Sequence, residues 1–407
     1  MTHAAHSEYD AYRPPEPPRG GRRRRGGRAR QSPDLLSGGD GSREVPMVSD
    51  PEFESYYGRS IVKAPPWEWP IGLYLFVGGL AGGSAVLAGG AAVTGRELLR
   101  RNARLVALGA VSAGLPALVV DLGRPERFLN MLRVFKPTSP MSMGTWLLSG
   151  FGVSAGFAAA GEVDRMTGER LPLGALRPVL RALEAAGTAG SVVLGGPLAS
   201  YTAVLLGDTA VPTWAGARKG LAYVFVSSAT MASTGAAMVL TPSRETGPAR
   251  VLAVAGVIGE LVATHRMKDQ MHELEAEPLE IGRPGRFLKL SERLAIAGGL
   301  GTLLGGRFRP VAVLSGLALL SASALTRFGV LEAGHESVKD PRRVVEPQRE
   351  RLERRRAQGI IDDSITTAPV TGDRPQEDPE QTGPGPERPE ATAPGSVHPG
   401  DRGRGEL

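Results

Sequence analysis

The chain has 407 residues with a formal net charge of +6, and it contains no cysteine. Disulfides, thiolate zinc sites and iron–sulfur clusters all need cysteine sulfur, so none of them is expected within this chain. The positive charge lies mainly in tails and loops, as is usual beside membrane spans, and it therefore gives little support to nucleic-acid binding.

The middle of the sequence is apolar, although the mean hydropathy of the whole chain is only −0.11. Residues 71–94 include no charged side chain. A helix of about 20 apolar residues crosses the hydrocarbon core of a bilayer. The 55 glycines and the aromatic content of 5% suit membrane helices that pack closely through small side chains. We therefore predict an all-α integral membrane protein.

The composition divides the chain into three parts. Residues 1–66 form an arm rich in arginine, proline and glycine, which has too little apolar sequence to build a core and is predicted to be disordered. The transmembrane domain is predicted over residues 67–330, and a polar, largely disordered tail over residues 331–407. The arginine run at 22–25 is not an export signal, because the first apolar run begins about 45 residues later.

Apolar windows between charged loops predict about eight transmembrane helices. They cover residues 71–94, 103–120, 144–161, 185–206, 220–240, 249–264, 294–306 and 310–326. The seventh window is short, and only a tight turn with Arg307 and Arg309 separates it from the eighth, so this pair is also compatible with a re-entrant hairpin. The chain is expected to turn polar after Arg327. An even number of spans places both tails on one side, and their arginine clusters favour the cytoplasm, but the short loops leave the orientation open.

Two loops echo each other along the chain. Asp121–Leu129 follows the second predicted span, and Glu280–Leu288 precedes the seventh; both contain Gly-Arg-Pro and end in Arg-Phe-Leu. These are equivalent places if the protein consists of two four-helix bundles. The echo is compatible with an internal duplication, although an arginine-rich sequence can also produce one such match by chance.

Span six carries a single carboxylate, Glu260, in an otherwise apolar stretch. A lone glutamate inside a membrane must be paired, protonated or exposed to water, and proton relays use such residues. Glu260 is therefore a candidate for a proton path, with a structural pair to an arginine of a neighbouring helix as the alternative. His265, beside Arg266 and Lys268, is expected to be an ordinary surface residue.

Two further positions are candidates for ligand binding. Tyr201 follows Gly195-Gly196-Pro197 in span four, where its phenol is suited to hydrogen-bond a ligand carbonyl or, alternatively, to lie in an interfacial aromatic belt. Asp121 and Arg124 close span two ahead of Pro125. They form a solvated salt bridge or line the mouth of a pocket, because the segment that follows to Met143 is suited to fold back on the protein surface.

Histidine usage argues against haem. The six histidines are His3, His6, His265, His272, His335 and His398, and we predict that only His265 approaches a span. A b-type haem in a membrane usually needs two axial histidines, so neither haem nor an intrinsic metal centre is expected. A phosphate-cradling glycine loop with Lys-Ser/Thr is also missing from the sequence, which argues against an ATPase.

Several motifs, in this order and spacing, resemble one family. They are Trp67-Glu68-Trp69-Pro70-Ile71 leading to Tyr74–Gly83, Asp121–Pro125, Lys136–Gly144, and Tyr201–Leu206 continuing to Ala210–Trp214. Over roughly residues 60–330 the chain resembles the NrfD/PsrC-like family of polysulfide-reductase membrane subunits. The arginine-rich arm and the acidic, proline-rich tail are outside the family pattern.

The resemblance implies a quinone-interacting membrane anchor in the cytoplasmic membrane, without haem and not catalytic on its own. Its implied partners are a four-cluster ferredoxin-like iron–sulfur subunit and a molybdopterin catalytic subunit, and its implied ligand is a quinone such as menaquinone, which exchanges two electrons and two protons. By position, Tyr201 would hydrogen-bond the quinone head group, Asp121 and Arg124 would line or support the pocket mouth, and Glu260 would belong to a proton path.

Two other functions remain compatible with the sequence. A secondary transporter would also show spans broken by glycine and proline, an intramembrane carboxylate and an internal repeat. An inert anchor without quinone chemistry would keep the membrane spans but would not depend on Tyr201. Substrate flux in liposomes and quinone-linked turnover of the assembled complex distinguish these functions.

Overall fold

A computed structural model describes residues 60–121 and 130–358, all of which fall in one structural unit. The described residues form eight helices of 20 residues or more. They are α1 (Trp69–Val93), α2 (Glu97–Asp121), α4 (Pro140–Met166), α5 (Arg177–Gly207), α7 (Leu221–Leu240), α8 (Gly247–Asp269), α10 (Gly282–Gly305) and α11 (Arg309–Ser337). The predicted arm up to residue 59, the loop at 122–129 with Arg124, and the tail from residue 359 lie outside the described residues.

Proline fixes the start of several of these helices. Pro70, Pro140, Pro178, Pro248 and Pro310 each stand in the first two positions of a long helix, where the missing N–H has no intrahelical partner to lose. Most of the helices extend beyond the predicted apolar windows, because charged residues at the windows' edges continue the helix as its first or last turn. These extra turns make the helices longer than the predicted apolar windows.

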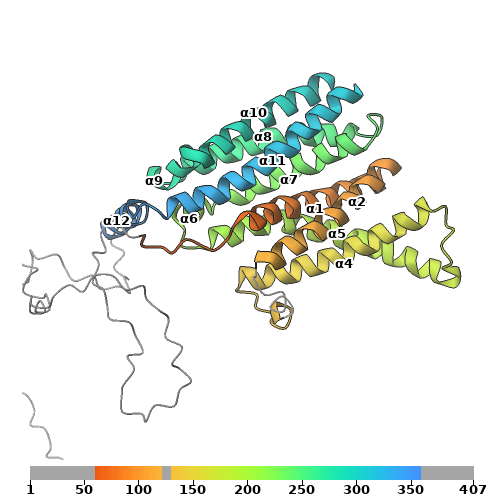
Figure 1. The fold of residues 1–407 in the computed structure, drawn as a ribbon, viewed down its shortest axis with the longest axis horizontal. Helices are drawn as coiled ribbons and strands as arrows, with labels where there is room; N and C mark the ends of the chain where they lie inside the picture. The colour runs from red at the N-terminus through yellow and green to blue at the C-terminus, as the bar shows by residue number, and fades with distance from the viewer. Residues whose placement is uncertain (1–59, 122–129, 359–407) are drawn as a thin grey trace, which may run out of the picture. The chain divides into compact units, whose positions relative to one another are not determined.

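The last two long helices correct the sequence expectation in detail. α10 and α11 pack side by side (Figure 1), and with 24 and 29 residues both are longer than the windows predicted at 294–306 and 310–326. Seven of the described helices are long and apolar enough to cross a membrane, and α10 is the long helix outside that group because its first half is charged. α11 continues past the predicted end at residue 326 to Ser337, and Arg327 is buried within it.

The eight helices form two groups of four, as the two-bundle prediction expects. The first bundle consists of α1, α2, α4 and α5, and the second of α7, α8, α10 and α11 (Figure 1). The two bundles meet where α1 and α5 pack against α7. Close approach depends on small residues: a Cβ at Gly82 of α1 would overlap the carbonyl oxygen of Gly195 on α5. The two glycines therefore allow the backbones of α1 and α5 to come into contact.

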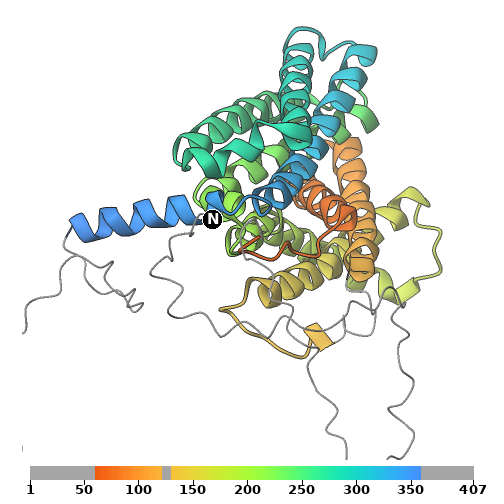
Figure 2. The same cartoon turned by 60° about the vertical axis from the view of Figure 1, so that its left-hand side comes forward.

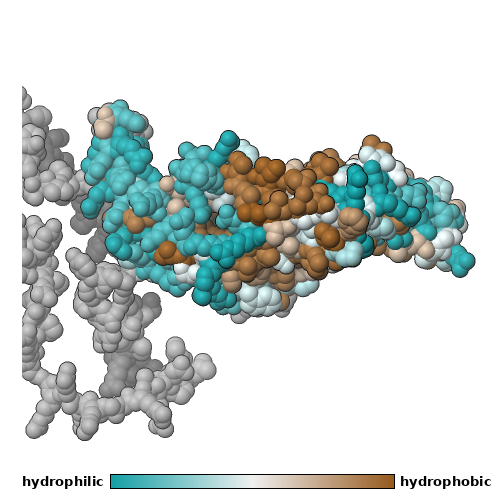
Figure 3. Space-filling view, turned by 90° about the horizontal axis from the view of Figure 1, so that it is seen from above, coloured by the Kyte–Doolittle hydropathy of each residue, from teal (hydrophilic) through white to brown (hydrophobic). Residues whose placement is uncertain are grey.

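The two ends of the bundles differ in structure. α1 begins and α11 finishes at the same end, which we call the proximal end; the opposite end is the distal end (Figure 1). Apolar surface lies across the middle of the face seen in Figure 3, with hydrophilic surface at both ends. Such a band is what a helical bundle presents to a bilayer. The start of α1 and the end of α11 thus share one side, as an even number of helices predicts.

Short helices cover the proximal end. They are α6 (Pro212–Ala217), α9 (Glu273–Ala276), the 3₁₀ turn Glu277–Leu279 and α12 (Arg342–Ala357). Figure 2 shows α12 extending sideways from the bundle. Arg343 donates to Glu277 at 2.8 Å and Arg351 to Glu275, so ion pairs attach α12 to this cap. Helical order therefore continues beyond residue 331, where the sequence predicts the polar tail to begin.

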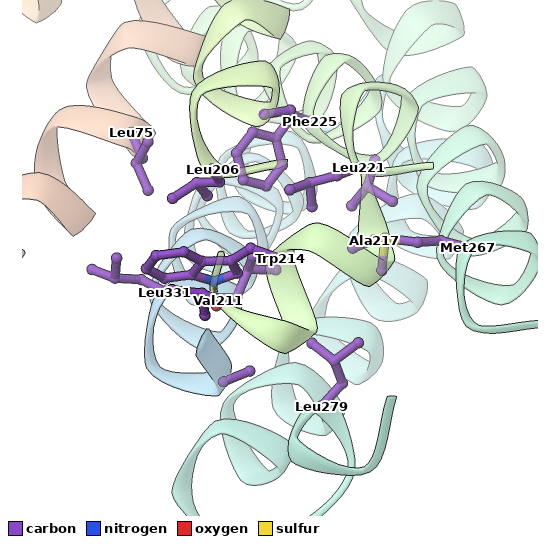
Figure 4. Packing of buried hydrophobic residues seen from close by; sticks show 14 of the residues in the cluster. Leu75, Leu206, Val211, Trp214, Ala217, Leu221, Phe225, Met267, Leu279 and Leu331 are labelled. Atoms are coloured by element: carbon purple, nitrogen blue, oxygen red, sulfur yellow. Dashed lines mark hydrogen bonds between the residues drawn. The ribbon is translucent and has the colours of Figure 1, made fainter. Parts of the chain in front are cut away.

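Trp214 of α6 anchors the cap in the core. Its side chain is fully buried, and its Nε1 donates to the Val330 carbonyl of α11 at 2.8 Å. The ring lies beside Leu331 and Val211 (Figure 4), and a Cβ at Gly334 would overlap it. Trp67 stacks on the other side, with ring centroids 5.5 Å apart. One side chain thus ties the segment before α1, the α5–α7 connection and α11 together.

An ionic cluster closes the distal end of the first bundle. Arg104 of α2 donates to Glu162 of α4 at 2.9 Å and to Glu184 of α5 at 2.5 Å. Arg165 forms two hydrogen bonds with Glu184, at 2.5 and 2.7 Å. Both glutamates are buried and each has more than one arginine partner. Three helices are therefore joined by shared charges at this end.

Candidate functional site

Two tyrosine hydroxyls meet near the proximal end of the first bundle. Tyr74 of α1 and Tyr201 of α5 lie with their oxygens 2.6 Å apart. Tyr74 is only 2% exposed, whereas Tyr201 is partly exposed. Each hydroxyl carries one proton, so one proton makes the bond between them and the other remains available. The pair can therefore offer one hydrogen bond outward through Tyr201, the more accessible member.

The start of α4 holds the Tyr201 ring in place. A Cβ at Gly144 would overlap that ring, so glycine is needed for the close approach of α4 and α5. Tyr201 is thus packed between helices and bonded to Tyr74, which differs from the exposed belt position that the sequence leaves open. The sequence does not predict the partner, Tyr74, because 127 positions separate it from Tyr201.

The segment before α4 folds back on the protein, as predicted for the part that the structure describes. Ser142 Oγ and Trp146 Nε1 both donate to the Val134 carbonyl, at 2.9 and 3.2 Å. Phe135 packs edge-on against Trp146. Phe135, Met141, Met143 and Trp146 are nevertheless exposed, next to the helix turn that holds Tyr201. We call these four exposed apolar residues, which lie in and just before the first turns of α4, the apolar patch.

Asp121 ends α2 at the proximal end of the same bundle. Its carboxyl lies near Glu68 at the start of α1. Asp121 is therefore at the same end of the bundle as the tyrosine pair, and the hydroxyls of that pair bond to each other and not to Asp121. Arg124, its predicted neighbour, lies outside the described residues.

A second candidate site surrounds Glu260 in the second bundle. A cavity of about 290 Å³ lies among α8, α10 and α11, with Glu260 and Thr326 among its lining residues. Thr326 Oγ1 donates to Glu260 Oε1 at 2.5 Å, and Ser291 Oγ lies 2.7 Å from the same threonine hydroxyl. The other carboxylate oxygen, Oε2, has no hydrogen-bond partner among the described residues. Glu260 is therefore a buried acid with one oxygen free.

The proximal part of this cavity is charged. Lys268, Glu280, Lys289 and Glu292 line it together with His265. Lys268 Nζ lies 3.0 Å from Glu280 Oε1, and this hydrogen bond holds the pKa of the Glu280 carboxyl below its usual value. Lys268 is eight positions after Glu260, which corresponds to about 12 Å along a helix. The cavity thus extends from a charged surface to a carboxylate within the bundle.

Arg327 lies close to Glu260 and is completely buried. Its Nη2 donates to the Phe225 carbonyl at 2.6 Å, and its guanidinium carbon lies 3.7 Å from the centroid of the Phe225 ring. The opposite charges of Arg327 and Glu260 attract each other. Nε and Nη1 of Arg327 have no hydrogen-bond partner within residues 60–121 and 130–358. The structure therefore places an arginine of a neighbouring helix near Glu260, but the two side chains form no hydrogen bond with each other.

The two histidines near the spans differ from each other. His265 is an 81% exposed side chain that pairs with Asp269, so the prediction of a surface residue is confirmed. The prediction that no other histidine approaches a span is wrong, because α11 extends far enough to include His335, whose ring lies near Trp214. Within the described ranges, no group of three or more His, Cys, Asp or Glu side chains is arranged to hold a metal ion.

The fold and the polar groups within it define a class. In the described part of the chain, seven helices are long and apolar enough to cross a membrane, and ionisable residues lie inside the bundles. Together with the apolar band (Figure 3), these are the features of a multi-pass membrane protein with internal polar sites.

Comparison with known proteins supports the resemblance. Residues 60–258 match the family model described as "Polysulphide reductase, NrfD". The resemblance seen in the sequence motifs is thereby confirmed over these residues. The match includes Tyr74, Tyr201 and Asp121, and it ends just before Glu260.

Two curated relatives share part of this region. The chain is 40% identical over 91 residues to "Protein NrfD" of Escherichia coli strain K12, which is 20% of this chain and 27% of the relative. It is 33% identical over 89 residues to the C subunit of polysulfide reductase from Wolinella succinogenes, which is 20% of this chain and 28% of the relative. The matched stretch thus spans little more than a quarter of either relative.

Proposed function

We propose that this protein is the quinone-interacting membrane subunit of an oxidoreductase complex. The observation that carries the proposal is the hydroxyl pair Tyr74–Tyr201, buried near the proximal end within the NrfD-like region. A quinone ring presents two carbonyl oxygens, and a phenol held in a fixed position is a suitable donor to one of them. The protein's own task is to bind and orient the ring, while redox chemistry belongs to the quinone itself.

The two tyrosines have different tasks in this proposal. Tyr74 is buried and fixes the position of the Tyr201 hydroxyl through the 2.6 Å bond. Tyr201 gives its hydrogen bond to the quinone oxygen. Conversion between quinone and quinol exchanges two electrons and two protons, so proton access to the site is part of the function. Asp121 and Arg124, at the end of α2 and beyond it, are proposed to support the mouth of this site.

The apolar patch of Phe135, Met141, Met143 and Trp146 supports the involvement of partners. Exposed apolar patches on proteins mark contacts with other proteins or with lipid. We propose that a four-cluster ferredoxin-like subunit covers the proximal end beside Tyr201 and connects it to a molybdopterin subunit. Menaquinone is the proposed quinone, and the cytoplasmic membrane the proposed location.

The cavity at Glu260 is proposed to be a proton path. The carboxylate has one oxygen without a partner among the described residues, and the cavity leads from it to a charged surface. Buried carboxylates of this kind serve proton transfer in membrane proteins. Glu260 lies outside the matched NrfD segment, so this part of the proposal depends on the geometry of the second bundle alone.

Replacement of Tyr201 by phenylalanine tests the quinone site. Loss of one hydrogen bond of about 1 kcal/mol is expected to weaken binding of a quinone analogue roughly fivefold. Quinone-linked turnover of the assembled complex should fall accordingly, while electron transfer from an artificial donor to the catalytic subunit should not. Ser200→Ala is the matched control, because the Ser200 hydroxyl contacts only its own helix backbone in the described structure. Unchanged quinone-linked turnover in Tyr201→Phe would mean an inert anchor.

Replacement of Glu260 by glutamine tests the proton path. An amide keeps the shape and the acceptor oxygen for Thr326, but it cannot carry a proton. In proteoliposomes that contain the whole complex, proton uptake linked to quinone turnover is expected to slow by about tenfold or more. Glu353→Gln, on the exposed face of α12, is the matched control. Equal proton uptake in the wild type and Glu260→Gln would remove Glu260 from the path.

A secondary transporter remains the second candidate, because the same cavity places a buried carboxylate within reach of one membrane face. A transporter would move a solute across liposomes that contain this chain alone. Under the proposed function, the protein without partners shows no solute flux in that experiment, whereas the assembled complex shows quinone-linked turnover.

A further inference from the structure

The outer face of α7 and α8 carries a groove that neither candidate site uses. It has a volume of about 810 Å³ and lies on the side of α8 away from the Glu260 cavity. Small residues form its floor: Ser227 of α7 and Ala255 and Gly259 of α8. A Cβ at Gly259 would come within 2.8 Å of Ser227 Oγ, so the two helices approach closely here.

The walls of the groove are apolar and face outward. Ile258 and Val262 of α8 and Tyr223 of α7 are exposed side chains, and Tyr223 is 71% exposed. Ala255 marks one end of the lining on α8 and Gln270 the other, which is about 22 Å along the helix axis. The groove therefore begins at the proximal surface and extends well into the depth of the hydrocarbon layer.

The proximal rim of the groove is positive. Lys219, just before α7, and Arg266, in the last turns of α8, both line it and are exposed. Neither has an ion-pair or hydrogen-bond partner in the part of the chain that the structure describes. The neighbouring charges of α8 point elsewhere: Lys268 pairs with Glu280, and Asp269 with His265. Two cations without counter-charges among the described residues thus lie at the proximal rim of the apolar groove.

We propose that this groove is a binding site for an anionic phospholipid. The phosphate would lie between Lys219 and Arg266, with Gln270 as a further donor, and one acyl chain would fill the space between Tyr223 and Ile258 over the small residues. Charge complementarity selects this occupant, because basic pockets between membrane helices bind anionic head groups. The groove would also fit the tail of a quinone. A quinone is neutral, however, so it would leave the two cations without a counter-charge. The inference is independent of the proposed redox function.

Native mass spectrometry of the full chain in mild detergent tests the site. Dioleoylphosphatidylglycerol, dioleoylphosphatidylcholine and a neutral menaquinone are each titrated separately. The wild type is expected to bind one phosphatidylglycerol at least tenfold more tightly than phosphatidylcholine. A Lys219→Gln/Arg266→Gln double variant should bind phosphatidylglycerol about 30-fold more weakly than the wild type does, since each cation near anionic lipid contributes about fivefold. The preference over phosphatidylcholine should then disappear.

Two further variants separate shape from charge. Ala255→Trp fills the floor of the groove while it keeps both cations, and it is expected to reduce binding of the phosphatidylglycerol acyl chain. Arg286→Gln/Arg349→Gln removes two exposed proximal cations outside the groove and should leave binding unchanged.

Three outcomes would overturn the proposal. One is equal binding of phosphatidylglycerol and phosphatidylcholine by the wild type. The second is tighter binding of menaquinone, unaffected by loss of Lys219 and Arg266. The third is a dimer of the protein that Ala255→Trp converts to a monomer, because the groove would then be covered by a second copy.

Discussion

Replacing Arg327 by leucine is expected to lower the free energy of unfolding by about 3–5 kcal/mol. Arg327 is 0% exposed and lies between α7, α8 and α11. Leucine would lose the bond to the Phe225 carbonyl and the contact with the Phe225 ring, and it would leave Glu260 buried without its counter-charge. Unfolding of the detergent-solubilised protein in sodium dodecyl sulfate, followed by far-UV circular dichroism, measures the change.

A second substitution separates the two contributions to this loss of stability, the packing of Arg327 and its charge. In Arg327→Leu/Glu260→Gln both charges are removed, so the double variant should be more stable than Arg327→Leu alone. Arg293→Leu is the matched control, because Arg293 is exposed on α10 and its loss should change stability by less than about 0.5 kcal/mol. A double variant as unstable as the single one would show that Arg327 acts through packing and not through Glu260.

Replacing Trp214 by alanine should cost about 3–5 kcal/mol, the usual range for removing a buried tryptophan. The ring is enclosed by Trp67, the backbone of α11 at Gly334, and Val211. Its loss leaves a cavity and also leaves the Val330 carbonyl without its donor. Thermal unfolding followed by far-UV circular dichroism measures the effect without depending on tryptophan fluorescence.

Trp146→Ala provides the comparison for Trp214→Ala. Trp146 is 41% exposed and makes a single hydrogen bond to Val134, so its loss should cost about 1 kcal/mol. Similar destabilisation by the two alanine variants would contradict the view that Trp214 anchors the proximal cap. Trp214→Phe should fall between them, because it keeps part of the ring volume but not the hydrogen bond.

The sequence predicts the membrane helices well because length and apolarity are local properties. The windows at 71–94 and 220–240 end within a few residues of α1 and α7. It is less accurate for α10, whose predicted window starts at residue 294. The first half of that helix carries Lys289 and Glu292, which line the charged cavity, and a hydropathy window counts such residues as loop.

Tertiary contacts explain what the sequence could not predict about the sites. Arg327 looks like the end of a span, since a positive charge usually lies at the membrane surface, yet Glu260 and the Phe225 ring stabilise it inside. The pairing of Tyr74 with Tyr201 depends on how α1 and α5 cross at Gly82 and Gly195. No local pattern contains that information. Glu260 and Tyr201 are candidates from the sequence alone because polar groups within spans are few.

The ionic cluster at Arg104, Glu162 and Glu184 has a consequence for the first bundle. Shared ion pairs join α2, α4 and α5 firmly at the distal end, whereas the proximal ends of α4 and α5 meet through the ring of Tyr201 over Gly144. The two ends of α4 and α5 are therefore held together by different forces: shared charges at the distal end, and aromatic packing with one hydroxyl pair at the proximal end. High salt should weaken the distal contacts and leave the contacts of the two tyrosines unchanged.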